Sequence, residues 1–203
     1  EWLLSAYRQG IFPWYMPGEP ILWWSLDPRM VLFPSELHIG RSLAKVLRNR
    51  SYEIRMDTSF REVMLACALP RADGFGSWIG EEIVEGYCTL HALGHAHSIE
   101  TWIDGRLVGG LYGVALGNMF FGESMFALQA DASKIAFARF VPWLAEQGFE
   151  LIDCQMRTHH LARFGAREIA REDFCARLGQ LVTQPRSPGL WHHKISNTVG
   201  SGS

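Results

Sequence analysis

The chain has 203 residues, of which 48% are hydrophobic and 20% are charged, and this composition suits one medium domain with a buried core. Its longest apolar runs, such as residues 107–116, are broken by glycine and fall short of the roughly 20 residues that cross a bilayer. The formal net charge of −2 argues against a protein that coats nucleic acid non-specifically, because that mode requires broad neutralisation of phosphates.

The four cysteines Cys67, Cys88, Cys154 and Cys175 are scattered, without the C-x-x-C spacing of a zinc site or a redox dithiol. No signal-peptide pattern is visible either. We therefore expect reduced, mostly packed thiols in a cytoplasmic protein.

The first fifty residues predict two helices around an irregular aromatic segment. Residues 1–9 have the pattern of a short helix that ends at Gly10. From 10 to 34, prolines recur among tryptophans and a tyrosine, which predicts an ordered segment without regular elements that packs against the main domain. Residues 39–49 have helical spacing with three cations on one face, and a solvated surface explains such a face as well as a partner does. The cations are Arg41, Lys45 and Arg48.

The middle of the chain predicts two helices followed by an antiparallel meander. A strand at 52–56 precedes Ser59 and Glu62, whose spacing is that of a capping box at the start of a helix reaching about residue 69. Another helix is expected over 81–93, closed by Gly94. Asp104-Gly105 is the strongest hairpin signal, and the strands of the meander are expected at 98–103, 106–116 and 118–121.

The last third predicts a helix, a buried strand and a final helix. The first helix covers 131–147 and ends before Gly148, although Pro142 predicts a kink or an early stop. The strand is expected at 149–154 and the final helix at 171–181, followed by a Pro/Gly/Ser-rich tail of low order. The whole order is α+β and is similar to that of the GCN5-related N-acetyltransferase fold, a similarity that says little about function.

Five segments, in order over nearly the whole chain, resemble the leucyl/phenylalanyl-tRNA–protein transferase family. They are Gly10-Ile-Phe-Pro-Trp14, Leu22-Trp-Trp-Ser25 running to Asp27-Pro-Arg29, Leu93-Gly-His-Ala-His-Ser98, Gly122-Glu-Ser-Met-Phe126 and Leu151-Ile-Asp-Cys-Gln155. The resemblance implies a small N-terminal domain, here a remnant over 1–29, joined to an acetyltransferase-like catalytic domain over 30–203. An upstream strand and a Gly-Gly-Asp turn of the family are absent, so a truncated small domain is expected. Leu26 stands where the family usually has proline.

The resemblance implies transfer of Leu or Phe, and less readily Met, from aminoacyl-tRNA to proteins that begin with Arg or Lys, which marks those proteins for degradation. We expect a monomer that uses no metal and no organic cofactor. The reaction is attack of an α-amine on the ester carbonyl of the charged tRNA. The protein must position the reactants, accept a proton and stabilise the oxyanion.

Three residues are the candidate catalytic groups. Asp153 and Gln155 are two apart in a strand and should project together at its end. In the family account the Asp polarises the Gln, which draws the proton, but a carboxamide is too weakly basic for that task. We therefore assign orientation to Gln155 and proton acceptance or relay to Asp153; a helix cap and a loop donor are the structural alternatives. Glu123 is expected to bind the acceptor's α-amine or its cationic side chain.

The resemblance also implies sites for the two parts of the charged tRNA. An apolar pocket for the amino-acid side chain would use Met125, Phe126, Ile152 and Phe137, which are equally good core residues. Aromatic side chains near the terminal adenosine would be Tyr7, Trp14, Trp78 and Tyr87, with core packing as the alternative. The cationic face of residues 39–49 would contact acceptor-stem phosphates, which position a tRNA without reading its sequence.

Three other interpretations fit the residues less well. A metal at His91, His95 and His97 is disfavoured because Gly94 ends the helix and no Glu supplies a base. An acyl-CoA-dependent N-acetyltransferase is disfavoured because residues 126–133 contain no glycine for a pyrophosphate-binding turn. A non-catalytic tRNA-binding module leaves the Asp153 and Gln155 pair unexplained.

Overall fold

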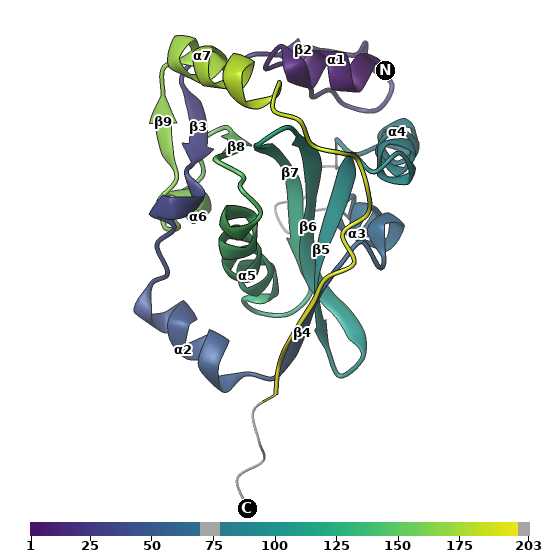
Figure 1. The fold of residues 1–203 in the computed structure, drawn as a ribbon. Coiled ribbons are helices and arrows are strands. Elements are labelled where there is room, and N and C mark those ends of the chain that lie inside the picture. Colours follow the sequence, from purple (N-terminus) through teal and green to yellow (C-terminus); the bar gives the residue numbers. More distant parts are fainter. Residues whose placement is uncertain (70–77, 199–203) are drawn as a thin grey trace, which may run out of the picture.

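A mixed eight-stranded sheet with helices on both faces forms the body of the molecule (Figure 1). The computed structural model describes residues 1–69 and 78–198. The helices are α1 (Trp2–Arg8), α2 (Arg41–Asn49), α3 (Phe60–Cys67), α4 (Glu81–Ala92), α5 (Ala132–Glu146), α6 (His159–Ala162) and α7 (Arg171–Leu181), with a 3-10 turn at Pro34–Glu36. The strands are β1 (Phe12–Pro13), β2 (Trp23–Trp24), β3 (Arg29–Leu32), β4 (Tyr52–Met56), β5 (Ala96–Ile103), β6 (Arg106–Leu116), β7 (Met119–Ala127), β8 (Leu151–Gln155), β9 (Arg167–Ile169) and β10 (Lys194–Asn197). The α+β class with a sheet flanked by helices is confirmed.

The sheet has the strand order β10-β4-β5-β6-β7-β8-β3-β9. The β5–β6 hairpin turns at Asp104 and Gly105, whose φ angles of 49° and 71° are those required by a two-residue hairpin loop. All neighbouring strands are antiparallel except β7 and β8, which are parallel. The chain must therefore cross over between these two strands, and α5 makes that crossover.

The parallel pair β7–β8 is joined along only part of its length. Met119–Phe121 pairs with Leu151–Asp153, whereas β7 continues to Ala127 and β8 to Gln155. The two strands separate beyond this short ladder, and the backbone between them opens at the middle of the sheet.

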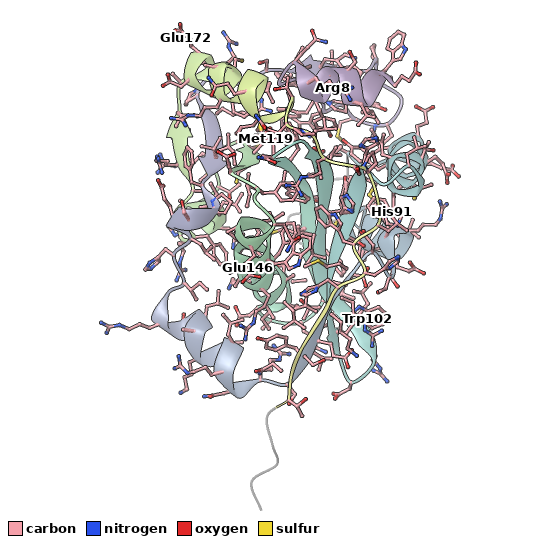
Figure 2. The ribbon with its side chains drawn as sticks, viewed as in Figure 1. Arg8, His91, Trp102, Met119, Glu146 and Glu172 are labelled. Atoms are coloured by element: carbon pink, nitrogen blue, oxygen red, sulfur yellow. The ribbon has the colours of Figure 1, made fainter. Side chains whose placement is uncertain are left out.

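Two apolar cores lie on the two faces of the sheet. One is formed mainly by side chains of α1, α3, α4 and α7 packed against the strands. The other contains α2 and α5 together with Trp191 and Phe164. Figure 2 shows the side chains filling both faces, with Arg8 and Glu172 at one end of the molecule and Trp102 toward the other. Among the described helices, none combines the length and the apolar character needed to span a membrane.

Most of the expected elements are present, and the structure differs from the expectations in the following ways. The segment 10–34 contains regular strands: β1 pairs with β2, and β3 lies between β8 and β9 in the main sheet. The tail adds β10, which pairs with β4. Helix α5 continues through Pro142 to Glu146, so the predicted early stop does not occur.

The capping box predicted at Ser59 is also replaced by a different contact. Ser59 is the N-cap residue of α3, but its side chain makes no capping hydrogen bond. The Glu100 carboxylate of β5 instead accepts from the backbone N–H groups of Thr58 and Ser59 at 2.9 and 2.7 Å. A residue more than forty positions away therefore satisfies the helix start.

Candidate active site

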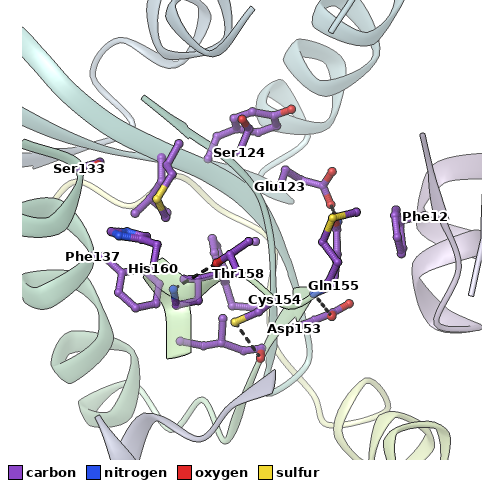
Figure 3. A pocket seen from close by; sticks show the side chains of 18 of the residues that line it. Phe12, Glu123, Ser124, Ser133, Phe137, Asp153, Cys154, Gln155, Thr158 and His160 are labelled. Atoms are coloured by element: carbon purple, nitrogen blue, oxygen red, sulfur yellow. Dashed lines mark hydrogen bonds between the residues drawn. The ribbon is translucent and has the colours of Figure 1, made fainter. Parts of the chain in front are cut away.

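A cavity of about 520 Å³ occupies the opening between β7 and β8. One side is polar and contains Glu123 and Gln155; the other is largely apolar and contains Phe137, with His160 beside it (Figure 3). The short ladder between the two strands is therefore what makes room for a ligand at the centre of the sheet.

A β-bulge sets the position of Glu123. Tyr112 pairs with Ser124 while Gly113 pairs with Gly122, so Glu123 is the extra residue on β7. A bulge redirects the side chains around it. The carboxylate turns toward α1 and α4, where Tyr7 Oη donates to Oε1 at 2.6 Å and Tyr87 Oη donates to Oε2 at 3.0 Å.

Glu123 and the two tyrosines form one buried hydrogen-bonded cluster, in which Tyr7 and Tyr87 also make a short hydrogen bond to each other. Burial raises the pKa of Glu123 from 4.5 to about 8, against the lowering effect of the two phenol hydrogen bonds. A carboxyl group with this pKa can accept a proton and return it near neutral pH.

Burial and the neighbouring carboxylate raise the pKa of both tyrosines well above 10.0, so Tyr7 and Tyr87 remain neutral hydrogen-bond donors. Both are at most 1% exposed. The expectation that they stack on an adenosine was therefore wrong: their rings are packed in the core and their hydroxyl groups hold Glu123.

Asp153 is engaged by a buried arginine. Arg29 Nε donates to Oδ1 at 2.8 Å and Arg29 Nη2 donates to Oδ2 at 2.6 Å, and both side chains are 1% exposed. The guanidinium lies between Phe12 and Phe174, 4.7 Å from each ring centroid. Because both Asp153 oxygens already accept charge-assisted hydrogen bonds, this carboxylate is poorly suited to the proton acceptance that we assigned to it.

Asp153 instead holds the backbone of Gln155. The Gln155 N–H donates to Asp153 Oδ1 at 2.8 Å, and Gln155 has a φ of 61°, which is costly for a residue with a side chain. Its side-chain Nε2 donates to Glu123 Oε1 at 3.0 Å. Among the described residues, no donor contacts its amide oxygen, so the cavity contains an oriented hydrogen-bond acceptor beside Glu123.

The apolar side of the cavity contains three of the four expected pocket residues, Met125, Phe137 and Ile152. Phe126 was placed there wrongly. Successive side chains of a strand point to opposite faces, so Phe126 packs into the core of α3 and α4 while Met125 faces α5. Further apolar lining comes from Leu111, Phe120 and Leu161.

The two expected tryptophans lie at the cavity. Trp14 and Trp78 both line it, and Trp14 is 39% exposed. They are positioned where a flat ligand group could stack.

The cationic face lies elsewhere. Arg41, Lys45 and Arg48 are exposed on α2, at the end of the molecule opposite α1 and α7 (Figure 1). The structure thus separates this face from the cavity that contains the tryptophans.

The three histidines considered for a metal have other roles. His97 Nδ1 bonds Asp57 Oδ2 at 2.8 Å, and His91 Nδ1 lies 2.8 Å from the Ala96 carbonyl oxygen. His95 is half-buried and makes neither of these two contacts. Within residues 1–69 and 78–198, no group of three or more His, Cys, Asp or Glu side chains is arranged to hold a metal ion.

Comparisons with known proteins show the family to which the chain belongs. The sequence profile of "Leucyl/phenylalanyl-tRNA protein transferase" matches residues 31–179, and the profile of that family's N-terminal domain matches residues 1–27. The chain belongs to the leucyl/phenylalanyl-tRNA protein transferase family.

Relatives that bear the name "Leucyl/phenylalanyl-tRNA--protein transferase" are similar over most of their length. The Laribacter hongkongensis protein is 59% identical over 96% of this chain and 84% of its own, and the Chromobacterium violaceum protein is 58% identical over 94% and 82%. A solved GCN5-related N-acetyltransferase from Kribbella flavida has a TM-score of 0.43 and 11% identity over 82% of this chain and 60% of that chain. At that TM-score the likeness carries no argument. The domain boundary at residue 29 stays a prediction.

Arg29 is the residue of this transferase site that sequence reasoning missed. It ends the Asp27-Pro-Arg29 segment by which the family was recognised, but no role was assigned to it. Its partner Asp153 is 124 positions away, and only the pairing of β3 with β8 brings the two together.

Proposed function

We propose that this transferase moves leucine or phenylalanine, and less readily methionine, from aminoacyl-tRNA to the N-terminal amine of proteins that begin with Arg or Lys. The product would be a substrate for degradation, and the enzyme would work in the cytoplasm as a monomer without a cofactor. The observation that carries the proposal is a carboxyl group of raised pKa, Glu123, beside an oriented amide at the polar side of an otherwise apolar cavity.

The cavity suits an esterified amino acid. A leucine or phenylalanine side chain fits the apolar side between Met125, Phe137 and Ile152, where unbranched Met125 adapts to either shape. The ester carbonyl then lies toward Gln155. The terminal adenosine is assigned to Trp14 and Trp78, and the acceptor-stem phosphates to Arg41, Lys45 and Arg48.

Glu123 is assigned as the proton acceptor in place of Asp153. The α-ammonium group of the acceptor protein donates to the Gln155 amide oxygen and to Glu123, and transfers one proton to Glu123. An α-amine has a pKa of roughly 8, close to that of Glu123, so this transfer is nearly balanced in free energy.

The neutral amine then attacks the ester carbonyl and forms the new C–N bond. Collapse of the tetrahedral intermediate breaks the C–O bond to the ribose. The nitrogen releases its second proton to solvent water as the amide forms. The leaving ribose oxygen takes up the proton that Glu123 holds, which returns Glu123 to its carboxylate form. Asp153 and Arg29 act as positioning residues that keep Gln155 in place.

The direct test is transfer of labelled phenylalanine from Phe-tRNA to a peptide that begins with Arg. Label in the peptide is expected, with none in a matched peptide whose α-amine is acetylated. Binding of Phe-tRNA without transfer would make the protein a tRNA-binding module, and modification only with acetyl-CoA would make it an N-acetyltransferase. Gln155→Ala should slow transfer strongly while the affinity for Phe-tRNA stays near normal, and a near-normal rate would refute the proposed mechanism.

A further inference from the structure

An exposed apolar surface continues outward from the cavity along the β1–β2 hairpin. Four consecutive residues, Ile21, Leu22, Trp23 and Trp24, are 52%, 47%, 40% and 38% exposed. We refer to them as the hairpin patch. Large apolar side chains that remain exposed in one short segment are candidates for an interaction site, and tryptophan is among the residues enriched at the energetic centres of such sites.

The hairpin joins this patch directly to the candidate active site. Phe12 and Pro13 of β1, which line the cavity, pair with Trp24 and Trp23 of β2. The Trp24 ring lies 5.9 Å from the Trp14 ring, and its Nε1 donates to the Trp14 carbonyl oxygen at 2.7 Å. A molecule with one end in the cavity could therefore extend onto the hairpin patch past Trp14.

The charges around the hairpin favour a polypeptide over a nucleic acid. Between Gln9 and Pro28 the sequence contains no Lys or Arg, and its charged residues are Glu19 and Asp27. One cation from elsewhere in the chain, Arg171, lies against this segment, where its guanidinium donates to the Ser25 carbonyl oxygen. Phosphates bind where cations gather, and the exposed cationic face of α2 lies at the other end of the molecule (Figure 1). The hairpin patch is therefore better suited to apolar side chains of a polypeptide than to a phosphate backbone.

We infer that the hairpin patch binds the acceptor polypeptide just downstream of its N-terminal residue, as an extended and partly apolar segment. This inference rests on the proposed function and adds a separate path for each substrate. The tRNA approaches from the side of α2, and the acceptor approaches over β1 and β2. Selection of the acceptor then depends on several residues beyond the first.

The test compares acceptors that can and cannot reach the patch. One acceptor is a dipeptide that begins with Arg; the other begins with the same dipeptide and continues with apolar residues to about ten residues, which span roughly 30 Å when extended. The variant is Ile21→Ser combined with Trp23→Ser, which leaves the contact of Trp24 with Trp14 in place. The control is Leu93→Ser, since Leu93 is also an exposed apolar residue (58%), at the end of α4.

The double variant should lower kcat/KM for the long acceptor by about tenfold, mainly through KM, as expected for loss of an interface tryptophan and its apolar neighbour. Transfer to the dipeptide and the KM for Phe-tRNA should stay within about twofold of wild type, and the melting temperature within a few degrees. Leu93→Ser should leave these quantities and transfer to the long acceptor unchanged. Equal losses for both acceptors, a raised KM for Phe-tRNA, or unchanged kinetics would each overturn the inference. Failure of the wild-type protein to modify either acceptor would instead overturn the proposed function.

Discussion

Glu123 is the residue on which the proposed chemistry depends, and its raised pKa makes a pH-dependent prediction. Glu123→Gln keeps an acceptor for the tyrosines but removes proton acceptance. Near pH 7 the acceptor amine is mostly protonated, so transfer should fall by about 10²–10⁴-fold, the usual contribution of a general base. Above pH ~8 the amine is already neutral, and the loss should shrink.

Rate profiles between about pH 6.5 and 9, with Phe-tRNA binding measured in parallel, check this prediction. Binding should be unaffected because Glu123 contacts the incoming amine and not the apolar side of the cavity. A ratio of wild-type to variant rate that stays constant over the whole pH range would exclude Glu123 as the base.

The buried pair of Arg29 and Asp153 makes a prediction about stability and activity together. Arg29→Met leaves the Asp153 carboxylate buried without its partner, which should cost about 3–5 kcal/mol of unfolding free energy. Adding Asp153→Leu removes that charge and should restore most of the stability. Transfer should stay slow in the double variant, because the Gln155 N–H has lost its acceptor.

Urea unfolding and transfer kinetics on the same samples separate the two effects. If the double variant recovers both stability and transfer, the pair has no positioning role. If the single variant is as stable as wild type, Asp153 does not carry a buried charge.

At this scale, the residues whose place at the cavity could be predicted are those that follow from strand alternation or from the motif that contains them, and their roles stay predictions. Met125 and Ile152 fall into the cavity, as expected for neighbouring strands that face the same helix. The burial of Tyr7 and the pairing of Arg29 could not be predicted, since each depends on a partner more than a hundred positions away.

At the scale of elements, the approach of α5 to the sheet depends on a glycine in β6. A Cβ built on Gly109 would lie 2.5 Å from the Ala132 Cβ and 2.9 Å from the Ser133 backbone nitrogen. Gly109→Ala should therefore push the start of α5 outward and cost about 1–3 kcal/mol of stability. Ser133 and Phe137 of this helix line the cavity, so the KM for Phe-tRNA should rise as well.

Gly179→Ala is the matched control, because nothing lies within 4 Å of the added carbon and the residue is inside α7. Alanine is the better helix former there and should stabilise the protein by about 0.5–1 kcal/mol. Thermal unfolding of both variants measures these two changes in stability. A Gly109→Ala protein as stable as wild type, or more stable, would show that α5 can move without a loss of free energy.

Local signals predicted the elements whose ends are marked by residues within or next to them, such as the Asp104-Gly105 hairpin and the last helix at 171–181. The short strands β3 and β10 were missed because their pairing is decided by partners far along the chain. The early stop at Pro142 does not occur, for a related reason. Buried packing of α5 residues on both sides of the proline outweighs the single backbone hydrogen bond that it removes.

At the scale of the whole molecule, the C-terminal segment completes the sheet, and a buried histidine helps to hold it there. The Trp191 ring stacks on the His97 ring with centroids 3.5 Å apart, and the backbone N–H of Trp191 donates to Asp57 Oδ2 at 2.6 Å. Asp57 also bonds His97, and His91 lies 3.7 Å from its other oxygen. From there the chain continues into β10, which pairs with β4 at one edge of the sheet.

Burial lowers the pKa of His97 below 6.5, although the hydrogen bond to Asp57 opposes this shift. A lowered folded-state pKa means that the unfolded chain binds more protons below pH ~6.5, so the unfolding free energy should fall as the pH falls through this range. His97→Gln keeps a donor for Asp57 but does not titrate. Its unfolding free energy should drop less than that of wild type between about pH 7.5 and 5.5.

Urea unfolding at both pH values, with hydrogen exchange at the β10 amides, measures the effect. Protection of the β10 amides, corrected for the pH dependence of intrinsic exchange, should be lower at the lower pH in wild type, because protonation of His97 destabilises the packing around Trp191. Identical pH dependence in the two proteins would place the acid sensitivity elsewhere, since the other histidines whose pKa burial lowers, His95 and His160, are unchanged in this variant.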